Sequence, residues 1–143
     1  MQDMTPDAYR RFMLEGPRTA KLATVRADGR PHVAPIWFDL DGEILVFTTG
    51  EDTVKGKNVR RDPRVNLCVD DDKPPFAYAL IEGRAQILAS TPAELLYWAT
   101  RIAGRYMGPD LAEAYGKRNG VPGELLVRVT PTRVLARTGI SDW

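Results

Sequence analysis

The most informative segment of the chain is Phe47-Thr-Thr-Gly-Glu-Asp-Thr-Val-Lys-Gly-Lys-Asn-Val-Arg-Arg-Asp-Pro-Arg64. A strand is predicted to end at Thr49, and the residues after it can cap a short helix over 54–61 that Pro63 closes. Helix N-termini present free N–H groups and a positive dipole end, which suit a phosphate. The segment indicates either an anion site or a solvated basic helix neutralised by Asp52 and Asp62. Its cations are Lys55, Lys57, Arg60, Arg61 and Arg64.

Upstream of this segment the apolar residues alternate with a period of two, which is typical of strands. Strands are predicted over 21–26, 31–38 and 43–49, joined by tight turns at Asp28-Gly29 and Asp41-Gly42. Before them, Thr5-Pro6-Asp7 is a helix start, and Gly16-Pro17 ends that helix. The first half of the chain is therefore expected to be one helix followed by a meander.

Downstream, strands are expected over 64–70, 76–89, 123–130 and 133–137, with Gly83 as a candidate bulge. A helix is expected to enter at 90–94, and a second short helix is expected over 110–117. The fold class is mainly β with helices (α+β). Six to seven antiparallel strands are expected to form a closed or partly open barrel with short covering helices. No linker or repeat divides residues 1–143, so a single domain is predicted.

Composition restricts the function classes. Twenty basic residues oppose nineteen acidic ones, and this near-balance argues against a nucleic-acid partner. No apolar stretch reaches membrane-spanning length and no signal sequence precedes the first helix, so we expect no membrane partner and a cytoplasmic location. The single cysteine, Cys68, and the single histidine, His32, leave no ligand set for zinc, and the acidic run at 70–72 is expected to be solvated. We therefore predict no metal.

The chain resembles the pyridoxamine 5′-phosphate oxidase-like superfamily, and within it the branch of deazaflavin (coenzyme F420)-dependent oxidoreductases. The resemblance rests on segments in the same order along nearly the whole chain. It implies a split β-barrel of the FMN-binding type and a homodimer, with two cofactor sites in grooves between the subunits. The segments are Leu22–Phe38, Leu45–Gly50, Thr53–Val65, Ile81–Ala85 and Tyr115–Gly123.

The resemblance also implies roles for individual residues. Thr53, Lys55 and Asn58 would lie at the cofactor phosphate, with Lys57 near the anionic tail of the deazaflavin. Pro35, Ile36 and Trp37 would line the tricyclic ring. The remaining implied positions are Phe47, Thr48 and Thr49 beside the ring, and Phe76 and Tyr78 from the partner subunit. No catalytic acid or base is assigned.

The chain departs from the family pattern at two places. Oxidases of pyridoxamine phosphate carry an arginine–histidine motif near the C-terminus, whereas this chain ends Arg137-Thr-Gly-Ile-Ser-Asp-Trp143. Position 53 is threonine where some relatives place arginine. The resemblance implies an oxidoreductase that passes hydride from reduced F420 to a small, conjugated, electron-poor acceptor. FMN as the cofactor, and a carrier or sensor without turnover, remain alternatives.

Overall fold

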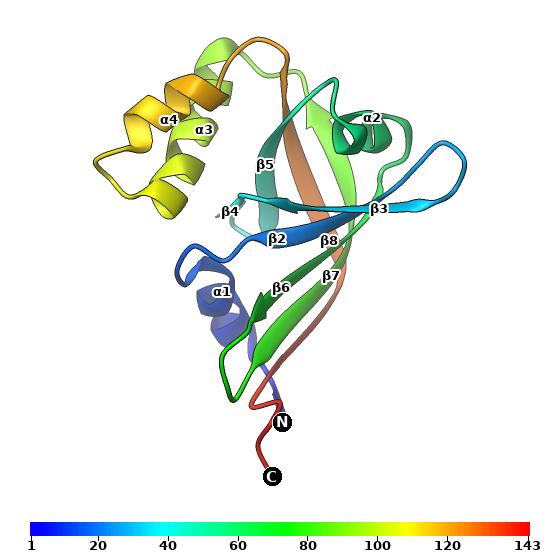
Figure 1. Ribbon diagram of the computed structural model, residues 1–143, viewed down its shortest axis with the longest axis vertical. Helices are drawn as coiled ribbons and strands as arrows, with labels where there is room; N and C mark the ends of the chain where they lie inside the picture. The colour runs from blue at the N-terminus through cyan, green and yellow to red at the C-terminus, as the bar shows by residue number, and fades with distance from the viewer.

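The computed structural model describes all residues, Met1–Trp143, as a curled antiparallel sheet with four helices around it (Figure 1). The sheet order is β3-β2-β6-β7-β8-β5-β4, and β1 pairs with the end of β8. The elements in chain order are β1 (Gln2–Asp3), α1 (Pro6–Leu14), β2 (Ala20–Val25), β3 (Pro31–Ile36), β4 (Asp39–Asp41), β5 (Ile44–Gly50), α2 (Val54–Arg61), β6 (Arg64–Asp71), β7 (Ala77–Leu88), α3 (Pro92–Met107), α4 (Ala112–Asn119) and β8 (Glu124–Thr138).

The two edges of the sheet meet because the chain connects them. β3 and β4 are the terminal strands in the sheet order, yet only Trp37 and Phe38 separate them in sequence. Such a short link brings the two edges within about 10 Å of each other at this point. The sheet therefore curls into a barrel that no β3–β4 ladder seals, which confirms the expected α+β barrel with an opening on one side.

The last strand corrects the sequence-based expectation. Residues 123–130 and 133–137 were expected as two strands, but β8 is one strand of 15 residues. A register shift at Gly83 explains the difference, because Glu82 pairs with Arg133 while Gly83 pairs with Pro131, which leaves Thr132 as an extra residue. A bulge accommodates proline, which has no N–H for a ladder. The predicted irregularity at Gly83 is confirmed.

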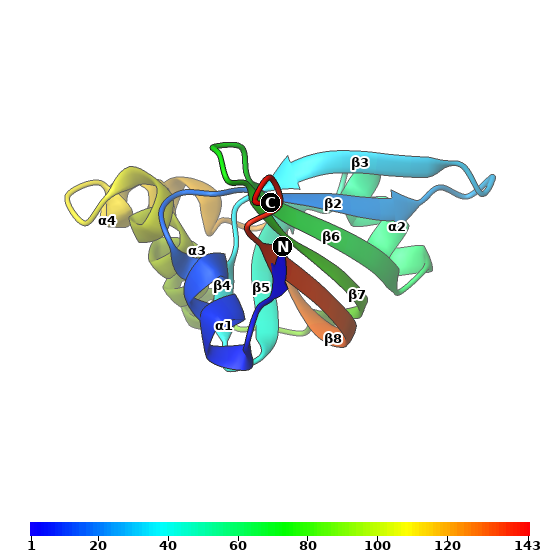
Figure 2. The same cartoon turned by 90° about the horizontal axis from the view of Figure 1, so that it is seen from below.

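The main core fills the barrel interior and extends beneath α1. Its fully buried members include Phe38 and Phe47, and α1 adds Phe12 and Met13. Thr5 caps α1, because its hydroxyl group accepts a hydrogen bond from the Ala8 N–H at 3.1 Å. Figure 2 shows the two chain termini close together beside β8, on the side of the barrel that α1 covers.

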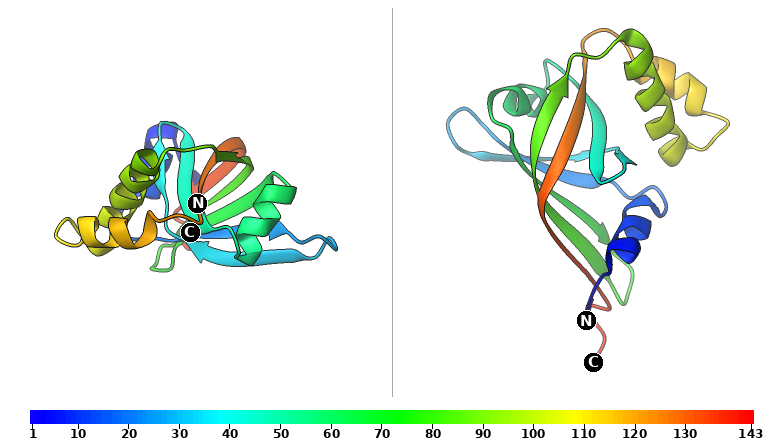
Figure 3. Two further views of the ribbon diagram at one scale, coloured as in Figure 1. Left: turned by 90° about the horizontal axis from the view of Figure 1, so that it is seen from above. Right: turned by 180° about the vertical axis from the view of Figure 1, so that it is seen from behind.

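A helical hairpin, α3–α4, lies on one side of the barrel, and α2 lies on the other (Figure 3). Leu95 of α3 packs with Val46 and Leu126 in a second, smaller core. The two helices approach closely at Gly116, where an added Cβ atom would lie 2.1 Å from the Thr100 hydroxyl oxygen. None of the helices combines the length and low polarity that crossing a lipid bilayer requires.

The outer face of β3, β2, β6, β7 and β8 carries exposed apolar side chains. Val33 and Leu80 are 66% and 42% exposed. A shallow hollow of about 320 Å³ lies on this face, and Cys68 lines it. Cys68 points outward, opposite to the buried Val65, Leu67 and Val69, as the alternation predicts. Burial and the neighbouring Asp70 raise the pKa of the Cys68 thiol, so it is not an activated nucleophile.

Candidate functional site

The start of α2 is fastened to the end of β5 through the Thr53 hydroxyl group. This hydroxyl donates to the Gly50 carbonyl oxygen at 2.7 Å and accepts from the Gly56 N–H at 3.0 Å. The Thr49 hydroxyl oxygen lies 3.2 Å away, and Thr49 must be the donor there because Thr53 has already donated its hydrogen. Thr53 therefore has no hydroxyl hydrogen left for a ligand, and its role at the site is to position α2.

Gly56 allows this close contact between helix and strand. A Cβ atom at Gly56 would lie 2.3 Å from the Gly50 carbonyl oxygen, too close for any residue other than glycine. With Thr53 bonded to Gly56, the N–H groups of Val54 and Lys55 make no hydrogen bond in the structure. These two N–H groups and the positive end of the helix dipole are available to an anion.

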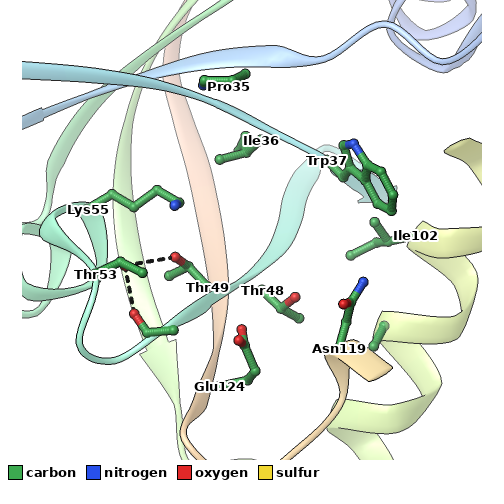
Figure 4. Close-up of a pocket in the computed structure, with 12 residues that line it drawn as sticks. Pro35, Ile36, Trp37, Thr48, Thr49, Thr53, Lys55, Ile102, Asn119 and Glu124 are labelled. Atoms are coloured by element: carbon green, nitrogen blue, oxygen red, sulfur yellow. Dashed lines mark hydrogen bonds between the residues drawn. The ribbon is translucent and has the colours of Figure 1, made fainter. Parts of the chain in front are cut away.

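These groups open into a cleft of about 370 Å³ (Figure 4). The cleft extends from α2 across β3 and β5 to the α3–α4 hairpin, and its side chains come from both halves of the chain. Lys55 and Glu124 are its only charged residues, and neither side chain has a hydrogen-bond or ion-pair partner. The lining residues are Pro35, Ile36, Trp37, Thr48, Thr49, Gly50, Thr53, Lys55, Ala99, Ile102, Asn119 and Glu124.

The end of the cleft away from α2 is apolar and aromatic. Trp37 stacks on Tyr106 with ring centroids 5.0 Å apart and an interplanar angle of 4°. Tyr115 of α4 lies 6.4 Å from Trp37 in a tilted arrangement. The Tyr106 hydroxyl donates to the Arg18 carbonyl oxygen at 2.8 Å and accepts from the Phe38 N–H at 3.2 Å. Burial raises the pKa of this hydroxyl, so it stays protonated and holds the aromatic wall in place.

Glu124 is a charged cleft residue that the sequence did not suggest. It is the first residue of β8 and lies directly across from Gly50 in the β5–β8 pair. Because Gly50 has no side chain, the Glu124 carboxyl group faces open space. A Cβ atom at Gly50 would lie 3.7 Å from Glu124 Oε1 and 3.3 Å from Thr53 Cγ2. Burial raises the pKa of Glu124, and the positive charge of Lys55 partly offsets this effect.

Seven of the twelve residues named from the sequence line the cleft, and five lie elsewhere. Phe47 is fully buried in the main core, so its side chain does not reach the cleft. Lys57 is exposed, because it projects about 200° around the helix from Lys55. Phe76 and Tyr78 lie at the far end of β7, where the strand pairs with Arg137 and Thr138 of β8, whereas Glu124 begins β8 at the opposite end.

Asn58 is the fifth residue outside the cleft. The resemblance implied a place for it with Lys55 at the cofactor phosphate, but its side chain is 3% exposed and points toward β2. Its Nδ2 donates to the Thr24 hydroxyl oxygen at 3.0 Å, and its Oδ1 accepts from Arg61 at 2.8 Å. Asn58 therefore anchors α2 to β2.

Five residues of the cleft were missed. Ala99 and Ile102 belong to the apolar stripe of α3, whose periodicity indicates packing but does not say against what. Asn119 and Glu124 border the turn between α4 and β8 and carry no local signal. In the acidic run at 70–72, Asp70 pairs with Lys21 at 2.9 Å and Asp71 pairs with Arg18 at 3.1 Å. No group of three potential metal ligands occurs in the structure.

The curled sheet, the opening between β3 and β4 and the lateral cleft define a split β-barrel protein. The chain belongs to the pyridoxamine 5′-phosphate oxidase family, whose model matches residues 5–138.

Solved structures support the same assignment. The conserved hypothetical protein Rv2991 from Mycobacterium tuberculosis superposes with a TM-score of 0.82 and 25% identity, covering 96% of this chain and 87% of that protein. An F420 reductase superposes with a TM-score of 0.71 and 30% identity, covering 87% of this chain and 94% of the reductase.

A curated relative is similar over part of its length. It is the 5a,11a-dehydrotetracycline/5a,11a-dehydrooxytetracycline reductase of Streptomyces rimosus subsp. rimosus, 38% identical over 76 residues. The match covers 48% of this chain and 54% of the reductase, so the chain spans about half the length of this relative.

Proposed function

We propose that this protein is an oxidoreductase that holds a deazaflavin of the F420 type in the cleft and acts as a reductase on a small, conjugated, electron-poor molecule. When bound, the deazaflavin supplies the hydride. The observation that carries the proposal is a single cleft with an anion-binding end at α2 and an apolar, aromatic end at Trp37. A ligand that joins a phosphate group to a flat ring matches both ends.

The residues at the α2 end of the cleft are suited to bind a phosphate group. Lys55 has no anionic partner within ion-pair distance, and the N–H groups of Val54 and Lys55 are free. Gly50, which lines the cleft, has no side chain to fill the space beside the start of α2, so a phosphate can approach the helix closely. Thr53 and Thr49 hold this geometry, and Asn58 fixes the helix from beneath.

The ring end fits a flat, apolar group. Pro35, Ile36 and Trp37 line the cleft, as do Ala99 and Ile102 of α3. Because Trp37 is braced by Tyr106, it offers a rigid surface that keeps a stacked ring in one orientation and excludes water from it. A cleft of about 370 Å³ is at the small end of the range of roughly 300–1,000 Å³ for ligand pockets. A second subunit would enlarge it.

We propose a homodimer that forms through the apolar outer face. Val33, Leu80 and Leu135 lie together on this face, where they line the hollow, and large exposed apolar patches mark interfaces. In this arrangement Phe76 and Tyr78, which lie far from the cleft of their own subunit, would complete the cleft of the partner.

The choice of the deazaflavin as the cofactor rests on one similar structure, which is named an F420 reductase. The name of the curated relative supports a reductase but mentions no cofactor. FMN is the alternative, because both molecules join a flat ring to a phosphate.

Fluorescence titration with F420 and, separately, with FMN tests the proposal. We expect tighter binding of F420, and a loss of roughly tenfold or more in Lys55→Ala, because a buried charge-assisted contact is removed. Lys73→Ala, which removes the same charge from the exposed β6–β7 turn, is the matched control and should bind as the wild type does. Preferential binding of FMN would move the protein to the flavin alternative, and binding of neither would refute the proposal.

A second measurement separates a reductase from a carrier. Reduced F420 is mixed with the protein and with conjugated quinones or enones, and its reoxidation is followed by absorbance. Turnover above the rate without protein supports a reductase. Tight binding with no turnover of any acceptor would make the protein a carrier.

A further inference from the structure

Glu124 places a negative charge in a cleft that otherwise attracts anions. It is one of the two charged residues of the cleft, and Lys55 is the other. The side-chain charges therefore cancel, and the remaining attraction for an anion comes from the N-terminus of α2, equivalent to roughly half a positive charge. Such a site attracts a ligand group with one negative charge and disfavours a group that carries two.

The position of Glu124 brings it close to the anion-binding groups. Its carboxyl oxygen and the side chain of Thr53, the N-cap of α2, border the same empty space above Gly50. Lys55 is close enough for its charge to act on the Glu124 carboxyl group. In Figure 4 the side chains of Lys55, on α2, and Glu124, at the start of β8, both point into the cleft, and Thr49 lies between them.

The other elements around Glu124 contribute no further charge. Glu51, in the turn between β5 and α2, pairs with Arg60 at 4.0 Å and does not line the cleft. The residues that β3, α3 and α4 present to the cleft are all uncharged. Nothing compensates the Glu124 carboxylate except Lys55.

We propose that Glu124 is a specificity-determining residue that makes the cleft select a singly charged phosphodiester over a phosphate monoester. This inference rests on the proposed function and names the chemical class of the phosphate group that the site accepts. A monoester loses its second proton near pH 6 and is largely a dianion at neutral pH. A diester has no second proton to lose and keeps one charge. The Glu124 carboxylate therefore repels the monoester about twice as strongly at neutral pH.

The first arm of the test uses small anions and needs no cofactor. Inorganic phosphate and dimethyl phosphate are titrated against the wild-type protein and Glu124→Gln, and the amide signals of Val54 and Lys55 are followed by NMR. At pH 7.5 we expect the variant to gain roughly tenfold in affinity for inorganic phosphate and less than about threefold for dimethyl phosphate. The difference should shrink toward pH 5, where phosphate carries one charge.

Glu51→Gln is the matched control, because it removes the same charge from a residue just outside the cleft. It should leave the preference between the two anions as it is in the wild type. Equal gains for both anions in Glu124→Gln, no gain, or no response of the Val54 and Lys55 signals to either anion would each overturn the inference. Circular dichroism of each variant verifies that it is folded.

The second arm uses FMN, a monoester, and F420, a diester, with ligand fluorescence as the readout. Glu124→Gln is expected to tighten FMN binding by several-fold relative to F420. If the small anions are discriminated while neither FMN nor F420 binds, the selection by Glu124 stands and the proposed function fails. If both cofactors bind but the substitution affects them equally, the proposed function stands and the role of Glu124 is refuted.

Discussion

The hydroxyl oxygens of Thr49 and Thr53 lie 3.2 Å apart and join the end of β5 to the N-cap of α2. Thr49 is 4% exposed, so this contact is shielded from water. Through it the strand determines where the helix begins, and the N–H groups of Val54 and Lys55 are left without a hydrogen-bond partner at the end of the helix that borders the cleft. The anion-binding end is therefore built by the backbone as much as by Lys55.

Replacing Thr53 tests this contact. Thr53→Ala removes the N-cap and all three hydrogen bonds of the hydroxyl group, so we expect a loss of about 1–2 kcal/mol in the free energy of unfolding. Affinity for anions should fall as well, because the N–H groups lose their fixed direction. Thr53→Ser keeps the hydroxyl group and should retain both properties. Urea denaturation and the phosphate titration measure them, and an unchanged Thr53→Ala would contradict the assigned role.

Gly56→Ala is expected to destabilise the protein by roughly 1–3 kcal/mol, because the new methyl group would overlap the Gly50 carbonyl oxygen. Gly104→Ala is the control within a helix, since a Cβ atom there lies 3.4 Å from the Ala112 Cβ atom. That substitution should be neutral or stabilise by about 0.5–1 kcal/mol. Thermal unfolding compares the two, and equal melting temperatures would refute the steric argument.

Asn58→Ala is expected to cost about 1–3 kcal/mol of stability, because the buried Thr24 hydroxyl loses its donor and Arg61 loses an acceptor. Under conditions where the variant is folded, its anion affinity should fall far less than that of Lys55→Ala. A double-mutant cycle with Thr24→Val isolates the pair, and a coupling near zero would contradict the anchoring role.

Stability should depend on pH through Glu124. Its folded-state pKa is raised, so the ionised form is disfavoured in the folded state. The contribution of Glu124 to the free energy of unfolding is therefore fully present at pH values below the ordinary pKa of a glutamate. It is lost as the pH rises through the raised pKa of the folded state. Glu124→Gln, which cannot ionise, should be more stable than the wild type at pH 7 and equal to it at pH 4. Urea denaturation across this range measures the difference, and the opposite order would refute the interpretation.

Leu80→Glu tests the proposed dimer. A charge placed in an apolar interface costs several kcal/mol, so the dissociation constant should rise by about 100-fold or more. Gln86→Glu adds the same charge to the same face of β7 but away from the hollow, so the dissociation constant of the dimer should stay as in the wild type. Sedimentation equilibrium gives the mass of each variant. A monomeric wild type would remove the basis of the proposed dimer.

Local signals in the sequence predicted the elements that depend on neighbouring residues. Thr5 was recognised as a cap and residues 50–53 as the capping segment of α2, and the hydroxyl groups of Thr5 and Thr53 accept hydrogen bonds from the helices they begin. The alternation around Cys68 predicted which side chains of β6 are buried. These features involve residues within about four positions of each other, so the pattern that encodes them is contained in the sequence.

Which residues line the cleft depends on contacts between residues that are far apart in the sequence. Phe47 and Asn58 are residue types suited to a cofactor site, yet both side chains face inward. The register of β5 and the packing of α2 against β2 determine these directions. Glu124 became a cleft residue only when β8 paired with β5 and placed it opposite a glycine, 74 positions away in the chain. Local periodicity and capping were therefore determined by the sequence alone, whereas pairing between distant strands, which depends on how the whole core packs, decided which side chains share the cleft.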